Sequence, residues 1–185
     1  MWIYEKKLMH PVIISQPDLH LARLLFEPYA GPSSAMTAAI SYLNQRFTMP
    51  TGVHKALLTD IGTEKHAHLE MIAGMIFQSI QGASLQQMKN AGLSEYFTEH
   101  GRSLFPADSG GTAWSAAYCV SSSDAKADVA FDMALEERLR VQFERLISYA
   151  QDDGYTEPLE FLKQRAIVHY QRFAEAANLL TDTNE

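Results

Sequence analysis

The stretch from Asp60 to Ala73 is the part of this chain that most constrains its fold, because its apolar residues recur at the spacing of an α-helix. One stripe of this helix carries the following apolar residues: Leu57, Ile61, Ile72 and Met75. Lys65 and His68 fall on the same stripe, so helical phase places both side chains inside a helical core. A buried lysine is rare unless it has a partner. The rest of the chain must therefore supply an acid that can pair with Lys65.

Size and composition predict one globular domain of ordinary type. The chain has 185 residues, enough to bury a sizeable core. Its net charge of -7, with acids and bases interspersed, argues against a nucleic-acid partner, because phosphate binding requires a basic face. Cys119 is the single cysteine, so no intramolecular disulfide can form. We find no signal peptide and no apolar run of transmembrane length, which predicts a cytoplasmic protein without a membrane partner.

Helical patterns cover most of the chain. The ranges that we expect are 18–27, 33–47, 53–80, a short helix at 84–91, then 124–151 and 157–180. Residues 92–123, rich in glycine, serine and aromatic residues, form a long connection between the two halves. Long helices with one mid-chain crossover predict an all-α, ferritin-like four-helix bundle. We expect a single domain over 1–185, with an extended arm at 1–16 and a frayed tail at 181–185.

Helical phase directs five polar side chains into the bundle: Tyr42, Lys65, His68, Glu136 and His169. The expected core stripe of the helix at 124–151 consists of Val129, Met133, Glu136, Arg140, Phe143 and Ile147. Two histidines and a glutamate from three helices are the kind of set with which bundles hold Mn, Fe, Zn or Cu. Core histidines that are only hydrogen-bonded are the simpler alternative. Lys65 favours a buried ion pair with Glu136 over a metal, because an ammonium about 4 Å from a divalent ion repels it by about 8 kcal/mol at an effective dielectric near 20. Glu64 is about 100 degrees off the inward direction of its helix, so we expect it to stay outside this group.

Several segments resemble the manganese catalase family. Residues 60–72, DIGTEKHAHLEMI, resemble the helix that carries two of the family's metal ligands. Residues 37–47 (TAAISYLNQRF), 112–118 (TAWSAAY) and 165–173 (RAIVHYQRF) are similar to its first core helix, its crossover and its last helix. The beginning MWIYEKK and the short length look most like the spore-coat members of the family. The resemblance covers nearly the whole chain.

The resemblance implies a site in which three glutamates and two histidines hold two manganese ions that dismutate hydrogen peroxide. Carried over residue by residue, it keeps three ligand positions and a nearby tyrosine: His68, Glu136, His169 and Tyr42. It loses three carboxylates, because non-acidic residues stand where the family has two ligand glutamates and a proton-handling glutamate: Ala35, Lys65 and Ala166. One remaining carboxylate cannot offset the charge of two divalent ions, so we expect no dimanganese centre.

Two functional hypotheses follow from the sequence. The first is a non-catalytic member of the family that acts as a structural or assembly protein, as in a spore coat, and needs no cofactor. The second is a metalloenzyme, for peroxide dismutation or other redox chemistry, with a reduced site that holds manganese or one Fe or Mn ion on three side chains: His68, Glu136 and His169. The resemblance implies a homo-oligomer, a hexamer as in the family, with other coat proteins as further partners.

Overall fold

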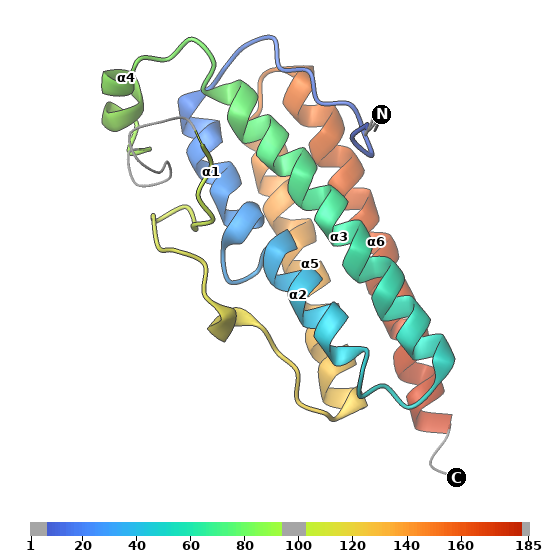
Figure 1. Ribbon diagram of the computed structural model, residues 1–185. Helices are drawn as coiled ribbons and strands as arrows, with labels where there is room; N and C mark the ends of the chain where they lie inside the picture. The colour runs from blue at the N-terminus through green and yellow to red at the C-terminus, as the bar shows by residue number, and fades with distance from the viewer. Residues whose placement is uncertain (1–6, 94–102, 183–185) are drawn as a thin grey trace, which may run out of the picture.

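The computed structural model describes residues 7–93 and 103–182, and these residues are mostly helical (Figure 1). The helices are α1 (Leu19–Ala30), α2 (Ala35–Gln45), α3 (Gly52–Ser79), α4 (Leu85–Asn90), α5 (Ala125–Tyr149) and α6 (Asp153–Asp182), with a short 3₁₀ helix η3 (Ala116–Tyr118). Among the described residues there is no strand, only an isolated bridge between Ala107 and Ala113. The predicted all-α fold is confirmed.

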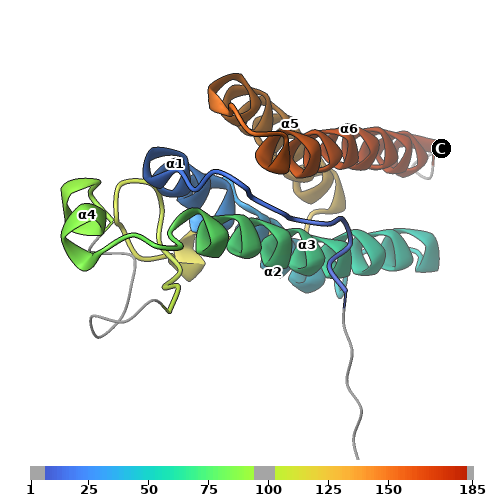
Figure 2. The same ribbon diagram turned by 90° about the horizontal axis from the view of Figure 1, so that it is seen from above.

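The long helices pack in two layers. Figure 2 shows α5 and α6 on one side of the molecule and α1, α2 and α3 on the other. Helices α1 and α2 follow one another along the bundle and together fill one of its four positions, beside α3, α5 and α6. The chain between α4 and α5 crosses from one layer to the other, which confirms the predicted crossover. No helix in the described part of the chain is long and apolar enough to span a membrane.

The break between α1 and α2 follows from local chemistry. A Cβ atom on Gly31 would meet the Glu27 side chain and backbone carbonyl, so the chain turns where only glycine fits. Ser34 then caps α2, because its Oγ accepts the backbone N–H of Thr37 at 3.2 Å. The Thr37 hydroxyl donates to the carbonyl of Gly31 at 3.1 Å and accepts from the indole of Trp114, also at 3.1 Å. These bonds fix the turn between α1 and α2 to the crossover, which contains Trp114.

The crossover is fastened to the outside of α2 and to the beginning of α5. The backbone N–H of Val120 donates to Ser41 Oγ at 3.2 Å, and the carbonyl of Val120 accepts from Gln45 Nε2 at 3.0 Å. Two residues later, Ser122 donates to Asp128 through its backbone N–H and its hydroxyl. The crossover therefore joins the two layers through side chains that are themselves buried.

Two helix boundaries differ from the prediction. The proline-containing segment 28–32 was expected to stop α1 at Glu27, but α1 continues through Pro28 to Ala30. A proline so close to a helix end removes only one hydrogen bond that the helix could form. Helix α6 begins at Asp153 rather than 157, because the carboxylate of Asp152 accepts the backbone N–H of Gly154 at 2.9 Å and caps the helix. At its other end α6 runs to Asp182, past the expected start of the frayed tail, and 183–185 lie outside the described residues.

The N-terminal arm packs against its own bundle across the ends of α3 and α6. Asp152 Oδ2 accepts the backbone N–H groups of Ser15 at 2.9 Å and Gln16 at 2.8 Å. On α3, the Gln78 side chain accepts from Ile14 N at 2.9 Å and donates to Val12 O at 2.8 Å. Over its described part, residues 7–16, the arm contains no helix or strand; residues 1–6 lie outside the described residues.

The contact between the arm and α6 requires a glycine at position 154. A Cβ atom there would overlap the backbone carbonyl of Ile13. We expect Gly154→Ala to lower the free energy of unfolding by about 1–3 kcal/mol, because the arm must move away from α6. Urea unfolding followed by circular dichroism measures this. The matched control is Gly52→Ala in the first turn of α3, where a Cβ atom meets nothing within 4 Å; an equal loss in both variants would contradict the prediction.

Candidate functional site

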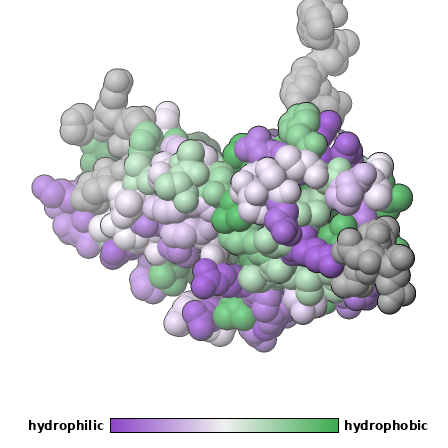
Figure 3. Space-filling view, turned by 90° about the horizontal axis from the view of Figure 1, so that it is seen from below, coloured by the Kyte–Doolittle hydropathy of each residue, from purple (hydrophilic) through white to green (hydrophobic). Residues whose placement is uncertain are grey.

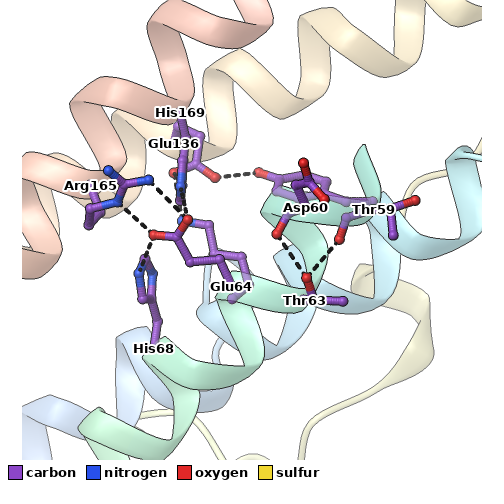
Figure 4. A network of polar contacts seen from close by, with 10 residues as sticks. Thr59, Asp60, Thr63, Glu64, His68, Glu136, Arg165 and His169 are labelled. Carbon is purple, nitrogen blue, oxygen red and sulfur yellow. Dashed lines mark hydrogen bonds and ion pairs between the residues drawn. The ribbon is translucent and has the colours of Figure 1, made fainter. Parts of the chain in front are cut away.

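A buried carboxylate, Glu136 of α5, forms the centre of the polar site (Figure 4). Its side chain is 0% exposed. Oε1 accepts the hydroxyl of Tyr42 at 2.8 Å, and Oε2 accepts the ammonium of Lys65 at 2.6 Å. Lys65 is itself 1% exposed, so this is a fully buried ion pair between α3 and α5. The acid that the sequence required for Lys65 is Glu136, as predicted.

A second carboxylate, Glu64 of α3, joins α3 to α6. Arg165 of α6 binds it through two parallel hydrogen bonds: Nε donates to Oε1 at 2.6 Å, and a terminal nitrogen donates to Oε2 at 2.9 Å. His68, one turn along α3, lies with Nε2 3.1 Å from Oε1 of Glu64. The Glu64 side chain is 17% exposed and Arg165 is 33% exposed, so this pair lies nearer to the surface than Glu136 does. Such bidentate pairs fix geometry as well as charge.

His169 of α6 lies between the two carboxylates. Its Nε2 is 3.2 Å from Oε2 of Glu64, and its Nδ1 is 3.5 Å from Oε2 of Glu136. Neither ring nitrogen is aligned with these oxygens for a hydrogen bond, so the contacts are electrostatic. The ring stacks on that of His68, with 5.7 Å between centroids and 18° between planes. The two predicted histidines therefore do meet at the middle of the bundle.

The two carboxylates are held ionised. Burial works against the charge of Glu136, but the Lys65 ammonium and His169 together outweigh burial and lower the pKa of this carboxyl to about 2. Burial likewise opposes the charge of Glu64, and the contacts with both histidines and Arg165 bring its pKa well below the usual range. Burial, together with the negative charge of Glu136, raises the pKa of the Tyr42 hydroxyl well above its usual value. At neutral pH Tyr42 is therefore a donor to a charged Glu136.

His68 is neutral at physiological pH. Burial disfavours its charged form and lowers its pKa from 6.5 to about 4, although the hydrogen bond to Glu64 acts in the opposite direction. The Lys65 ammonium adds to the effect of burial. Since a neutral imidazole carries one ring proton, Nε2 donates that proton to the ionised Glu64.

The lowered pKa of His68 predicts a loss of stability in mild acid. The unfolded chain binds a proton at this residue below about pH 6.5, and the folded chain only below about pH 4. Stability is thus fully present above pH 6.5 and falls as the pH drops towards 4, by up to about 3 kcal/mol. Urea unfolding at a series of pH values measures the slope. His68→Gln keeps a donor for Glu64 but cannot titrate, so it should flatten this slope; an unchanged slope would contradict the assignment.

The structure places the predicted inward residues as expected and corrects others. Five predicted residues are at most 1% exposed: Tyr42, Lys65, His68, Glu136 and His169. Glu64 was expected to point away from this group, but it contacts both histidines, so that expectation was wrong. Its side chain is long enough to reach sideways from α3 into the space between α3 and α6. The residue that draws it there, Arg165, lies 101 positions away and gave no local signal.

The predicted inward stripe of α5 is also partly wrong. Met133 and Arg140 were assigned to it, but Met133 is half-buried and Arg140 lies at the surface, between Glu137 and Glu144. The stripe instead includes two aspartates that the sequence did not single out, Asp128 and Asp132, both 0% exposed. They lie one and two turns before Glu136 on the same face of the helix.

Three positions where the resemblance expects carboxylates carry a residue of another kind. Ala35 and Ala166, where the resemblance expects carboxylates, are buried apolar residues, 1% and 0% exposed. Lys65 is bonded to the one carboxylate that remains at a ligand position, Glu136. Within the described residues no three His, Cys, Asp or Glu side chains are arranged to hold a metal ion. His68, Glu136 and His169 lie near one another. Lys65 is bonded to Glu136, and Glu64 contacts both histidines.

Comparisons with known proteins agree with these segments and with the fold. The family model "Manganese containing catalase" matches residues 1–185. Protein CotJC of Bacillus subtilis is 41% identical over 185 residues, covering 100% of this chain and 97% of that protein. The manganese catalase of Lactiplantibacillus plantarum is 32% identical, covering 98% of this chain and 73% of the enzyme. The crystal structure of KatB, a manganese catalase from Anabaena PCC7120, superposes with a TM-score of 0.87 and 31% identity, over 98% of this chain and 81% of KatB. The chain therefore belongs to the manganese catalase family.

Proposed function

We propose that this chain is a member of the family that has exchanged its dimanganese centre for internal ion pairs, and that it acts as a structural or assembly protein. The observation that carries the proposal is the 2.6 Å bond between Lys65 and Glu136 inside the bundle. The ammonium supplies the positive charge that a metal would otherwise supply. In this state the site offers no open position at which peroxide could react.

The charge balance of the centre supports the proposal. Glu136 is balanced by Lys65, and Glu64 is balanced by Arg165. Two divalent manganese ions would add about four positive charges to a centre that is already neutral, and the Lys65 ammonium would repel them. Carboxylates at positions 35 and 166 could have offset that charge, but alanines occupy both. The three exchanges thus act together and leave no buried acid at these positions without a partner.

Metal analysis tests this proposal. The protein is purified after growth with excess manganese and iron, its metals are measured by elemental analysis, and bound Mn²⁺ is examined by pulsed EPR for nitrogen couplings from coordinated imidazole. We expect essentially no ion that is coupled to imidazole nitrogen, and no peroxide turnover above that of free Mn²⁺. A stoichiometric, exchange-coupled manganese pair with rapid peroxide turnover would contradict the proposal.

A single-metal enzyme is the second candidate, and His169 is the observation that favours it. Both ring nitrogens of this buried residue face carboxylate oxygens without hydrogen-bond alignment. An ion bound by His68, Glu136 and His169 would need Lys65 to be neutral or displaced. About one ion per chain with imidazole nitrogen coupling, lost in His169→Gln, would establish this reading and exclude the structural one.

For the assembly role, we propose a homo-oligomer, a hexamer as the family resemblance implies, built from one ferritin-like domain. Figure 3 shows green hydrophobic areas interspersed with purple hydrophilic ones on one face of the molecule. Among the residues that the structure describes, five large apolar side chains are more than half exposed: Ile13, Phe47, Val53, Leu85 and Tyr149. The resemblance to short spore-coat members suggests coat proteins as further partners and the forming spore, within the cytoplasm, as the location. Light scattering coupled to gel filtration tests the oligomer, and a monomer would contradict it.

A further inference from the structure

A second group of buried polar side chains lies outside the central site, between α2 and α5. It consists of Asp128, Asp132 and Gln45, each 0% exposed. The two aspartates are one helical turn apart on α5, so their side chains share a face of the helix. The Gln45 amide, from the end of α2, lies beside the carboxyl group of Asp132. Three oxygen-bearing side chains from two helices therefore gather in one buried place.

Four oxygens of this group accept no hydrogen bond within the described part of the protein. They are Oδ1 and Oδ2 of Asp132, Oδ2 of Asp128 and Oε1 of Gln45. In Asp128 and Gln45 the other atom of the end group is engaged and fixes its orientation: Asp128 Oδ1 accepts from Ser122 N at 2.8 Å and from Ser122 Oγ at 2.7 Å, and Gln45 Nε2 donates to the carbonyl of Val120 at 3.0 Å. Since buried polar atoms are nearly always satisfied, a site with four free acceptors requires something that supplies positive charge or hydrogen.

No protein side chain of the described residues supplies that charge. At the centre of the bundle Glu136 has Lys65 and Glu64 has Arg165, but no ion pair joins Asp128 or Asp132 to a base. Burial, with the negative charges of Glu136 and Asp128, raises the pKa of Asp132 well above its usual value, and the Gln45 amide only partly opposes this. A proton on Asp132 would let one of its oxygens donate to a second oxygen of the group, and two of the four would remain without a partner.

We propose that Asp128, Asp132 and Gln45 bind a hard divalent cation, of the class of Mg²⁺, Ca²⁺ and Mn²⁺, through oxygen atoms alone. Carboxylate and amide oxygens are the ligands that these ions prefer, and water completes their coordination. Two carboxylates match the charge of one divalent ion. The site contains no imidazole and no lysine, so it is chemically distinct from the central site of His68, Glu136 and His169. A cation here ties α2 to α5 beneath the crossover, because Gln45 and Asp128 also hold Val120 and Ser122.

The test uses the full chain after treatment with a chelator. Mn²⁺, Mg²⁺ and Ca²⁺ are titrated separately by equilibrium dialysis, the thermal midpoint is recorded with and without each ion, and bound Mn²⁺ is examined by pulsed EPR. We expect about one ion per chain for at least one of the three ions, a rise of the thermal midpoint on binding, and no nitrogen coupling from imidazole. Asp132→Asn should weaken binding at least about tenfold while the chelated variant stays folded, since asparagine has nearly the same shape. Asp60→Asn, at an exposed aspartate of α3, is the matched control and should bind as the unchanged protein does.

Three results would overturn the inference. One is the absence of binding of all three ions up to millimolar concentration. Another is equal binding by the unchanged protein and Asp132→Asn. A third is a crystal structure, grown with the ion, that shows only water between Asp132 and Gln45. An ion that couples to imidazole nitrogen and disappears in His169→Gln belongs to the central site, and it contradicts the proposed function. If that is the only ion bound, it also overturns the oxygen site. A second ion without nitrogen coupling would support the oxygen site.

Discussion

Lys65→Met is expected to lower the free energy of unfolding by about 3–5 kcal/mol, the usual cost of leaving one buried partner of an ion pair uncompensated. Glu136, 0% exposed, would keep only the hydroxyl of Tyr42 as a strong donor. Its carboxyl group would have to be buried with an unpaired charge or take up a proton, and either change costs stability. Urea unfolding at neutral pH, followed by circular dichroism, measures the loss.

The control for this prediction is Lys55→Met on the same helix. Lys55 is exposed, so its replacement should change stability by less than about 0.5 kcal/mol. A double variant, Lys65→Met with Glu136→Gln, removes both charges and keeps an acceptor for Tyr42; it should recover most of the loss. A cost below about 1 kcal/mol for Lys65→Met alone would show that the ion pair does not hold the centre of this bundle together.

The second large effect is expected from restoring the missing acids. The triple variant Ala35→Glu, Lys65→Glu and Ala166→Glu places carboxylates where the family resemblance expects them and removes the repelling ammonium. With Glu136, His68 and His169 already in the bundle, we expect manganese content to rise by about two ions per chain over that of the unchanged protein and peroxide turnover to appear. Without manganese the same variant should be strongly destabilised, because several buried acids would repel one another. Elemental analysis, oxygen release from peroxide and thermal unfolding with and without Mn²⁺ measure these effects.

A neutral triple variant, with glutamine at the same three positions, is matched in size and separates charge from packing. It should bind no manganese that couples to imidazole nitrogen, and its thermal midpoint should depend on Mn²⁺ no more than that of the unchanged protein. If the glutamate variant folds but binds no more manganese than the unchanged protein, then positions 35, 65 and 166 are not the metal positions of this bundle, and the explanation offered for the three exchanges is wrong.

Local pattern predicted most of the fold but not the direction of every polar side chain. The long helices and the crossover followed from periodicity, and the inward positions of Lys65, His68 and His169 followed from their place on an apolar stripe. Glu64 could not be found in this way, because its partner Arg165 belongs to another helix and becomes a neighbour only when α3 and α6 pack. Partners that are so far apart in the sequence are determined by how the helices pack, and the spacing of residues within one helix does not reveal them.

The buried aspartates of α5 show a different limit. The stripe of α5 was drawn through Val129 and Met133, and hydrophobicity alone gives no reason to turn that stripe towards Asp128 and Asp132. What makes burial of Asp128 tolerable is Ser122, and what lies beside Asp132 is Gln45; both come from segments outside the helix. The pattern of apolar residues within one helix gives no information about buried acids whose neighbours lie on other segments, here the crossover and α2.

The ion pairs at the centre also determine how the two halves of the chain can meet. The half with α1, α2 and α3 contributes one base and one acid, Lys65 and Glu64, and the half with α5 and α6 contributes one acid and one base, Glu136 and Arg165. Sliding one half past the other by a single helical turn, about 5.4 Å, would separate both pairs at once and leave Lys65 and Glu136 buried and unpaired. Apolar side chains would tolerate several such offsets. Both ion pairs can form in only one alignment, so they favour the native docking of the two halves over the offset ones.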